Sequence, residues 1–520
     1  MINVAKVTSV RQVEPEFSDV RKWFEDNMGL DKIDLNDQKV YEHVYHDGHF
    51  PDIFQCTSKG AQKFFIKAKP RSIIDIAALT SIYRPGPLAA DVDKLWLEHE
   101  KDPYDWGHPL INETLKETRG LLVFQEAVMH LANKVAGFPM EQCDEVRRAI
   151  MKRSISGGEA AKKKVKELED SFVQGAIKNG VPEPIAKKAY ETIGFMSGYG
   201  FNKSHAVAYA IDSYYCAWLF THHEEEWLSA YLDTNSNNPD DKAKASSEVR
   251  MLGYEIVPID INYAEKSWRV LPGRKFMPSF LSCKGVGSTA VEEIVEKRPY
   301  DTIEDVLWNS DGSWKHSKFN KRGLEALISI GGFGSLDCIG DDKTFASQRQ
   351  MHHVVIEHCN DIRKTTKKDP SQGMKAFYEL TKTTRELEEW SSKERVERHV
   401  EFLGSFDGSS LIPSAVLKVL GEKGVLPVNE FEEQGIYWFI VVSAVLKKSK
   451  NGKDYVLAEI IGSNDKHHKM YVWGAKSTES ISLLEPYVGT VSKSEFGFGA
   501  NVWQMRKLNV SCVSSGRCHS

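Results

Sequence analysis

The segment GYGFNKSHAVAYA, residues 198–210, gathers residue types that can bind a phosphate group. Gly198 and Gly200 permit backbone conformations in which N–H groups closely approach an anion, and Lys203 adds a positive charge. A helix beginning after them would direct unpaired N–H groups and a positive dipole end at the same place. The segment is not a P-loop, because the chain has no GxxxxGK[ST] pattern. By spacing alone, a glycine-rich turn that starts a buried helix stays open as the alternative, with His205 a structural histidine.

Two further basic segments could bind the same kind of ligand. Arg84 lies in IYRPGPL, residues 82–88, where two prolines stiffen the turn that carries it. Helical spacing places four basic residues on one side of another segment: Arg147, Arg148, Lys152 and Arg153. The planar guanidinium fork suits phosphate oxygens, so three such segments together predict a charge clamp for a triphosphate. The alternatives are a structural loop and a solvated helix face.

Composition describes an ordinary globular protein of several domains. The chain has 520 residues, 41% hydrophobic and 27% charged, with a formal net charge of −5. No apolar run approaches the roughly 20 residues that cross a bilayer, so no membrane association is expected. The eight cysteines form no CxxC pair, which favours reduced thiols and a cytoplasmic location, in a cell or in a virus-infected host cell. MHHVVIEHC, residues 351–359, has one-turn helical spacing; a polar helix face is the prediction and a metal site the alternative.

The pattern along the chain changes twice. Residues 36–235 have helical periodicity, and the apolar stripe of residues 121–138 predicts one helix that ends at a glycine. Residues 253–281 indicate short strands around a Pro-Gly turn, followed by two glycine-bearing turns that each adjoin a helix. From residue 435 onward, strands around the hairpin signal Asn451-Gly452 predict a small closed β-barrel. The fold class is therefore multidomain α+β.

Six segments carry a family resemblance in their order along the chain. They are IFQCTSKG (53–60), SIYRPGPL (81–88), GLLVFQEAVM (120–129), VRRAIMKR (146–153), GYGFNKSHAVAYA (198–210) and CKGVGSTAVEEI (283–294). This order resembles the alpha subunit of bacterial DNA polymerase III, a C-family replicative DNA polymerase. The resemblance covers roughly residues 36–510, is dense to about residue 335, weak from 340 to 400 and moderate in the terminal barrel.

The resemblance implies a domain order. It assigns residues 1–80 to the end of the palm and the entry to the fingers, 81–245 to the mostly helical fingers, 246–340 to a tandem helix-hairpin-helix region that grips duplex DNA, 341–430 to a helical linker, and 431–520 to an OB-fold that receives single-stranded template.

The resemblance also implies three groups of site residues. The triphosphate of the incoming dNTP would meet Arg84, Arg147, Arg148, Lys152, Asn202, Lys203, Ser204 and His205. The duplex would meet Lys284, Gly285, Gly287, Lys321, Gly332 and Gly334. Single-stranded template would meet Tyr437, Lys447, Lys448, Lys450, Lys453 and Trp473, although about half of the barrel aromatics are expected to face the core. Where the family usually shows Gly-Lys-Lys, this chain has Met151-Lys152-Arg153.

The carboxylates that hold two Mg²⁺ ions in this family are not found in the sequence. Their strands, similar to PDxDxDF and KFDFLG, precede the region that residue 36 matches. We therefore expect a separate N-terminal chain, carrying the PHP domain and palm, to bind most of the Mg²⁺. A longer chain, of which this sequence is one part, would explain the missing carboxylates equally well. The implied partners are that chain, primer-template DNA, dNTPs and a sliding clamp, for which residues 372–377 are a poor, off-register peptide.

Two other functions stay open. A non-catalytic nucleic-acid-binding relic of such a polymerase would keep the hairpins and the barrel without the chemistry. A self-sufficient nucleotidyltransferase would use Asp91 and Asp93 as metal ligands, although the family has none at this place.

Overall fold

The computed structural model describes residues 32–152, 159–196, 200–404, 406, 408–449, 452–463 and 466–508. The predictions made for Gly198, Arg153, Lys450 and Asn451 lie outside the described residues, and of Lys152 only the backbone is described. The chain forms two compact units that meet in sequence at residues 227 and 228. Among the described residues, no helix combines the length and the apolar composition that crossing a membrane requires.

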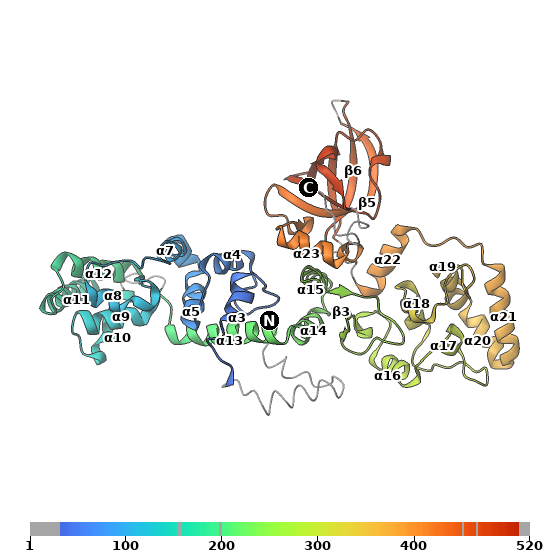
Figure 1. The fold of residues 1–520 in the computed structure, drawn as a ribbon, viewed down its shortest axis with the longest axis horizontal. Coiled ribbons are helices and arrows are strands. Elements are labelled where there is room, and N and C mark those ends of the chain that lie inside the picture. Colours follow the sequence, from blue (N-terminus) through green and yellow to red (C-terminus); the bar gives the residue numbers. More distant parts are fainter. Residues whose placement is uncertain are drawn as a thin grey trace. The chain divides into compact units, whose positions relative to one another are not determined.

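The first unit is helical, as predicted (Figure 1). Its elements are α3 (Gln38–Val40), η2 (Tyr41–His46), α4 (Lys59–Ala68), α5 (Ile73–Ile82), α6 (Pro85–Ala89), α7 (Val92–Glu98), α8 (Pro109–Thr114), η3 (Lys116–Thr118), α9 (Gln125–His130), η4 (Leu131–Val135), α10 (Met140–Lys152), α11 (Glu159–Lys178), α12 (Glu183–Met196) and α13 (Lys203–His222). Helix α14 (Glu224–Asn235) carries the chain from the first unit into the second.

Helix α13 packs along α5 and is anchored at its N-terminus and near its middle. Asn202 caps its N-terminus, and the buried Tyr214 donates a hydrogen bond of 2.8 Å to the carbonyl of Asp34. Ser213 on the same helix bonds to the hydroxyl of the buried Tyr45. The glycine-rich segment thus does start a buried helix, and this does not exclude a site at the helix N-terminus.

The helix predicted for residues 121–138 begins later than expected. Residues 121–124 are extended, and regular helix starts at Gln125. The cause is a distant partner: Phe124 forms a parallel bridge with Phe201, whose N–H donates to Val123 while its carbonyl accepts from Gln125. The backbone groups of this stretch are therefore satisfied by the glycine-rich segment.

The second unit opens with a small sheet and a helical array. Its elements are α15 (Pro239–Met251), β1 (Glu255–Ile256), β2 (Arg269–Leu271), β3 (Lys275–Met277), η5 (Phe280–Ser282), α16 (Ser288–Lys297), α17 (Ile303–Leu307), α18 (Lys321–Ser329), η6 (Gly334–Leu336), α19 (Gln348–His352), η7 (His353–Glu357), α20 (Cys359–Lys368), α21 (Pro370–Thr383) and α22 (Ser392–Leu403). The Pro-Gly turn joins β2 to β3 as predicted, with Gly273 at φ 84°.

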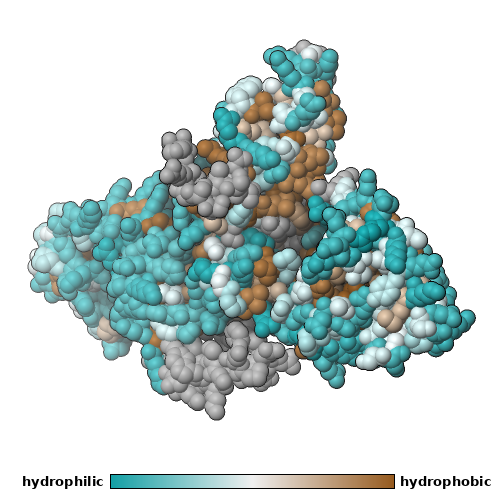
Figure 2. All heavy atoms as spheres, turned by 45° about the vertical axis from the view of Figure 1, so that its right-hand side comes forward, coloured by the Kyte–Doolittle hydropathy of each residue, from teal (hydrophilic) through white to brown (hydrophobic). Residues whose placement is uncertain are grey.

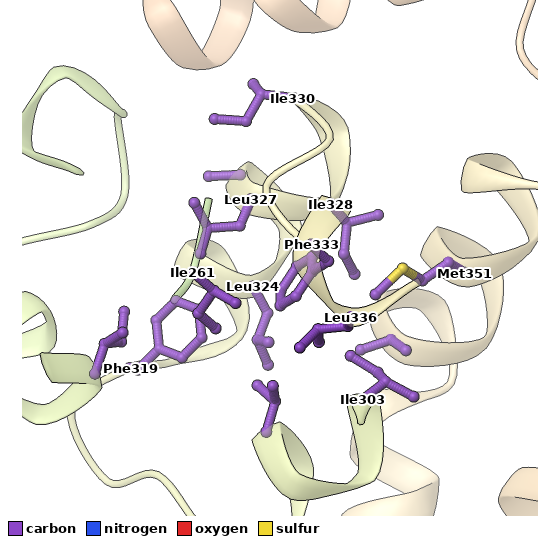
Figure 3. Close-up of a cluster of buried hydrophobic side chains, with 14 of the residues drawn as sticks. Ile261, Ile303, Phe319, Leu324, Leu327, Ile328, Ile330, Phe333, Leu336 and Met351 are labelled. Atoms are coloured by element: carbon purple, nitrogen blue, oxygen red, sulfur yellow. The ribbon is translucent and has the colours of Figure 1, made fainter. Parts of the chain in front are cut away.

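One apolar core fixes the two glycine-bearing turns. Figure 3 shows side chains from α17, α18, α19 and the segment at Ile261 pointing toward one another. Leu324, Leu327, Phe319 and Phe333 all lie in this core and are nearly inaccessible to solvent. Because α16 and α18 both bury side chains in this core, the turn before α16 and the turn after α18 are held in place.

The C-terminal elements form a barrel. They are η8 (Gly408–Leu411), α23 (Ser414–Glu422), β4 (Leu426–Pro427), η9 (Val428–Glu430), β5 (Gly435–Lys448), β6 (Asp454–Ile461), β7 (His468–Trp473), η10 (Thr478–Ser480), β8 (Pro486–Ser494), β9 (Gly497–Asn501), η11 (Val502–Gln504) and β10 (Met505–Lys507). The strand order is β10-β8-β9-β7-β6-β5-β4, and a further pairing of β5 with β8 closes the sheet. The predicted hairpin is confirmed, because β5 and β6 pair antiparallel with Lys448 opposite Asp454.

Candidate functional site

The N-terminus of α13 is a network of polar side chains centred on Asn202. The Asn202 amide oxygen accepts from the N–H of His205 at 2.9 Å and from the Ser204 hydroxyl at 2.7 Å. Its amide nitrogen donates to Glu126 at 2.8 Å, and Glu126 also accepts from the N–H of Lys203. Two N–H groups of the first helical turn are therefore already occupied by side-chain oxygens.

Arg84 lies beside this helix start. Its guanidinium carbon stands 4.3 Å from the centroid of the Phe201 ring, within the range of a cation–π contact. Arg84 is the residue before α6, so the two prolines of that short helix fix the backbone from which the side chain extends. The structure thus brings together two of the sequence-predicted segments.

Arg147 connects the third basic segment to the same place. Its Nη1 donates to the Gln125 side chain at 3.0 Å, and the Gln125 amide donates to the carbonyl of Gly200 at 2.8 Å. Its other side pairs with Asp144 at 2.6 Å, and Arg148 also pairs with Asp144 at 2.6 Å. The hydrogen bond from Arg147, with the charges of both arginines, lowers the pKa of Asp144.

The two arginines differ in how freely they can move. The Arg147 side chain is 21% exposed and held on two sides, whereas the Arg148 side chain is 68% exposed. We therefore expect Arg147 to be a fixed point of the cluster and Arg148 to adapt to a bound anion.

Lys203 is held by a carboxylate that sequence reasoning missed. Its Nζ lies 2.7 Å from both carboxylate oxygens of Glu117, and 5.9 Å from the centroid of the Phe124 ring. Glu117, Gln125 and Glu126 thus belong to the cluster although none was predicted. The latter two were visible as a polar pair inside the otherwise apolar LLVFQEAV, but Glu117 left no signal in the sequence.

His205 faces aromatic rings instead of a charged group. Its ring lies 5.4 Å from that of Phe201 and 4.2 Å, edge to face, from that of Tyr209. Tyr209 in turn stacks on Phe54 at 5.2 Å. The structure therefore places His205 and Tyr209 at the edge of the cluster, in an aromatic row leading away from it.

The described residues do not fit a magnesium site. They contain no group of three or more His, Cys, Asp or Glu side chains that could hold a metal ion. Asp91 precedes α7 and pairs with Lys94 at 2.7 Å, while Asp93 lies in the first turn of that helix. A carboxylate engaged by a lysine, with no third ligand nearby, is a helix-end feature. Likewise, His353 of the histidine-rich segment bonds to Glu357 at 2.6 Å on a helical face.

The first glycine-bearing turn of the second unit is open to solvent. Gly285 has φ 103°, and a Cβ there would lie 2.8 Å from Arg322, so this position requires glycine. Gly287 precedes α16 with open space where a Cβ would stand, and Lys284 beside it is exposed. Lys321, at the start of α18, is half-buried. The start of a ten-residue helix that has no side-chain cap, with a lysine adjacent, suits a phosphate.

The second glycine-bearing turn is filled from within the protein. Asp260 accepts hydrogen bonds from the Ser335 N–H at 2.8 Å and the Ser335 hydroxyl at 2.7 Å. Gly332 is buried, and its carbonyl accepts from the N–H of Ile261 at 2.9 Å. Gly334 lies next to Asp260. Because a carboxylate already holds this turn and Gly332 is buried, the first turn is the better candidate for DNA.

One outer face of the barrel carries aromatic and basic side chains in register. Lys447 lies opposite Tyr455, and Tyr455 lies opposite Trp473. The rings of Tyr455 and Trp473 are 5.1 Å apart, and Tyr471 lies 5.7 Å from Tyr455. Figure 2 shows apolar side chains reaching the surface of the barrel, which stands at the top of that view. Lys448 and Lys453 are exposed beside the row, at the end of the hairpin. Such a row suits stacking of unpaired bases.

Tyr437 does not belong to this face. Only 6% of it is exposed, and its hydroxyl donates to the carbonyl of Glu433 at 2.9 Å inside the barrel. Alternate residues of a strand point to opposite faces, and Tyr437 lies on the inward parity of β5 with Phe439 and Val441. Tyr437 is therefore no longer a candidate for base stacking.

Comparison with known proteins identifies two regions of the chain. Residues 12–180 match the family described as the bacterial DNA polymerase III alpha subunit finger domain, and residues 253–343 match a helix-hairpin-helix motif. The DNA polymerase III subunit alpha of Chlamydia trachomatis serovar D is 29% identical over 474 residues, covering 87% of this chain and 36% of that protein.

Two other relatives match a shorter part of the chain. The subunit alpha of Aquifex aeolicus is 32% identical over 305 residues, or 58% of this chain and 25% of that protein. That of Thermus aquaticus is 32% identical over 326 residues, or 60% of this chain and 25% of that protein. The chain thus spans about a third or less of the length of these relatives.

Proposed function

The chain belongs to the bacterial DNA polymerase III alpha family through its finger and helix-hairpin-helix regions, and we propose that it binds nucleotide and DNA for template-directed DNA synthesis. The observation that supports this proposal is that Arg84, Arg147 and Lys203 all lie around the glycine-rich segment, near Phe201. These three cations come from stretches far apart in sequence.

The cluster suits an anion that arrives and leaves. Lys203 is paired with Glu117, and Arg147 with Asp144. A bound triphosphate would replace each of these carboxylates by phosphate oxygens, which accept similar hydrogen bonds. Cations fixed in this way would offset the charge that builds on the transferred phosphoryl group. Arg84, Arg147, Lys203 and the backbone at Gly200 would orient the phosphates, and the more exposed Arg148 would close onto them.

The metal chemistry is assigned to another polypeptide. Mg²⁺ would activate the primer 3′-hydroxyl and stabilise the leaving pyrophosphate. The described residues of this chain do not fit such a site. We therefore propose that a separate N-terminal chain with the PHP domain and palm supplies the carboxylates, and that the two chains act together in the compartment where replication takes place.

The second unit would hold the DNA. The open turn at Lys284, Gly285 and Gly287 would contact the duplex backbone without reading bases. The face with Tyr455 and Trp473 would stack unpaired template bases, with the hairpin lysines near the strand.

Primer extension tests the proposal. This chain is purified alone and then mixed with a candidate N-terminal chain, with labelled primer-template, dNTPs and Mg²⁺. No synthesis alone and synthesis in the mixture is the expected result. Synthesis by this chain alone would contradict the two-chain proposal, and Asp91→Asn with Asp93→Asn would then be tested. No synthesis in either case, with DNA binding intact, would favour the non-catalytic relic, whose specific support is the open turn and the aromatic face.

A further inference from the structure

The described residues that line a small cavity of the first unit are all charged. The volume of the cavity is about 370 Å³, near the lower end of the roughly 300–1,000 Å³ at which proteins bind small ligands. Its walls come from the end of α4, the start of α5, the segment after α7 and the residue after η3. The lining residues are Lys69, Arg71, Asp75, Glu100, Lys101 and Arg119. Such walls suit a small ion better than a nucleobase or an aliphatic side chain.

The positive charges of this cavity are not neutralised by ion pairs. Among the described residues, no carboxylate lies within ion-pair distance of the exposed side chains of Lys69, Arg71 and Lys101. Asp75 instead accepts a hydrogen bond of 2.9 Å from the backbone N–H of Arg71. The carboxylate of Glu100 is exposed to solvent. Four cations against two carboxylates leave a net charge of +2 around the cavity, which favours an anion.

Arg119 is fixed in the cavity wall by neutral partners. Its guanidinium donates to the carbonyl of Trp96 at 2.9 Å and lies 4.3 Å from the centroid of the Trp96 ring. Its backbone has φ 56°, which is uncommon for a residue other than glycine, and its carbonyl accepts from the N–H of Tyr104. Burial lowers the pKa of Arg119, although the charges of Asp75 and Glu100 act in the opposite direction. A guanidinium that is held in place and partly removed from water is suited to an anion.

Two elements connect the cavity to the cluster proposed to bind the triphosphate. Arg71 precedes α5 and Arg84 follows it, and a helix of ten residues is about 15 Å long. Glu117 of η3 pairs with Lys203 of the cluster, and Arg119 of the cavity follows two positions later. The cavity is therefore a second anion site in the same unit, separate from the cluster but joined to it by short elements.

We propose that this cavity binds inorganic pyrophosphate, whose oxygens meet the four cations. Pyrophosphate is compact and multiply charged, so it can contact cations that converge from four segments, whereas a single carboxylate offers two oxygens. The source of the ligand rests on the proposed function, because pyrophosphate is the leaving group of DNA synthesis. The cavity would hold this product after it leaves the cluster. The binding itself involves only the first unit and is measured without DNA synthesis.

The test is isothermal titration calorimetry of the full chain with sodium pyrophosphate, without Mg²⁺ or DNA. We expect saturable binding that the double variant Arg71→Gln/Lys101→Gln weakens at least about tenfold, because two charged donors are removed. Both side chains are exposed, and circular dichroism checks that the variant is folded. No binding to the parent chain, or equal binding to parent and variant, would overturn this inference. Neither result would affect DNA synthesis by the two-chain mixture, so the two proposals fail separately.

Two further variants locate the binding. Lys67→Gln/Lys134→Gln removes two exposed lysines of the same unit outside the cavity and should leave binding unchanged. Arg147→Ala/Arg148→Ala changes the proposed triphosphate cluster and should keep the binding that the cavity variant loses. A loss of equal size in the lysine control would show a general effect of charge and contradict the inference. Binding lost only in the Arg147 and Arg148 variant would place pyrophosphate in the cluster alone and contradict it too.

Other ligands, titrated into the Arg147→Ala/Arg148→Ala variant, test the chemistry. Sulfate should bind at least about tenfold more weakly than pyrophosphate, because a single tetrahedral anion contacts fewer of the cations. Thymidine diphosphate should bind no more tightly than pyrophosphate, because the charged walls offer the base no surface. Sulfate that binds equally well would show a general anion site, and tighter thymidine diphosphate would show a nucleotide site. Displacement of pyrophosphate by lower concentrations of an oligothymidylate would show a contact with the DNA backbone. Each of these three results would overturn the assignment.

Discussion

Arg147 and Gln125 are joined by a hydrogen bond of 3.0 Å, and the Gln125 amide donates another of 2.8 Å to the carbonyl of Gly200. A single neutral side chain thus couples the arginine of α10 to the backbone that precedes α13. Gln125 also uses its own N–H to bind the carbonyl of Phe201. Gln125 therefore links the glycine-rich segment directly to the arginine.

Replacing Gln125 by alanine should loosen this coupling. Two side-chain hydrogen bonds are lost, each worth about 1 kcal/mol and more for the one from the guanidinium. We expect amide hydrogen exchange at Phe201 to become roughly tenfold faster. Gln142→Ala, an exposed glutamine on α10, is the matched control. Unchanged exchange at Phe201 in the Gln125 variant would show that the segment is positioned by other contacts.

Glu117→Gln should strengthen the binding of dNTP at the proposed triphosphate site. The carboxylate of Glu117 holds Lys203 at 2.7 Å and would compete with an anionic ligand for it. Because the pair is partly exposed, its net strength is at most about 1 kcal/mol, so the KM for dNTP should fall roughly two- to fivefold in a reconstituted extension reaction. Glu113→Gln, whose exposed partner is Lys116, serves as control. A rise in KM would mean that Glu117 itself positions Lys203 for the ligand.

The second unit should lose stability in acid through Glu293. Burial alone would raise the pKa of this carboxyl, but hydrogen bonds from the N–H groups of Ser317, Phe319 and Lys318, and from Lys297, outweigh it and hold the pKa far below its usual value. A carboxylate with a lowered pKa in the folded state contributes stability above its unfolded value of about 4.5, and this stability is lost as the pH falls below that value.

His316 acts in the same direction at higher pH. Burial lowers its pKa to about 4, against about 6.5 when unfolded, so its neutral form belongs to the folded state. The unfolded chain binds more protons between these values, and stability therefore falls as the pH drops from about 6.5 to 4.

Acid unfolding of variants separates these contributions. Glu293→Gln should reduce the free energy of unfolding at pH 7 by roughly 2 kcal/mol and flatten its dependence on pH below about 4.5. Glu296→Gln, an exposed neighbour on α16, should change neither. Urea unfolding followed at several pH values measures both quantities. A Glu293 variant with the full acid sensitivity of the parent chain would contradict this explanation.

Trp473 should carry much of the affinity of the barrel for single-stranded DNA. Its ring is 38% exposed and stands in the row with Tyr455 and Lys447. Trp473→Ala should cost about 1–3 kcal/mol in binding an oligothymidylate, the range for one stacked base. Phe496→Ala removes a ring that is 69% exposed between β8 and β9 and should have no effect. Equal loss in the two variants would mean that exposed apolar area, not this row, binds the strand.

Local chemistry explains what the sequence could predict. The hairpin between β5 and β6 and the Pro-Gly turn between β2 and β3 both depend on residues a few positions apart. The three basic segments of the first unit were also predicted to share a site, and the structure brings Arg84, Arg147 and Lys203 around the Phe201 segment.

Contacts between residues far apart in the sequence could not be predicted from it. Glu117 and Glu126 meet residues 202 and 203 from more than seventy positions away, so no spacing rule reveals them. The extended form of residues 121–124 depends on Phe201, not on their own apolar stripe. Tyr437 was misassigned because the inward or outward parity of a strand is fixed by its register in the barrel, and a one-residue change reverses it.

We propose that Arg147 and Arg148 bind the triphosphate of the incoming nucleotide. Steady-state primer extension in the mixture of this chain with the proposed N-terminal chain tests this most directly. The double variant Arg147→Ala/Arg148→Ala is compared with Lys187→Ala, which changes an exposed lysine of α12. We expect a steep rise in the KM for dNTP and a fall in kcat for the double variant alone. Both constants at the parental level would contradict it.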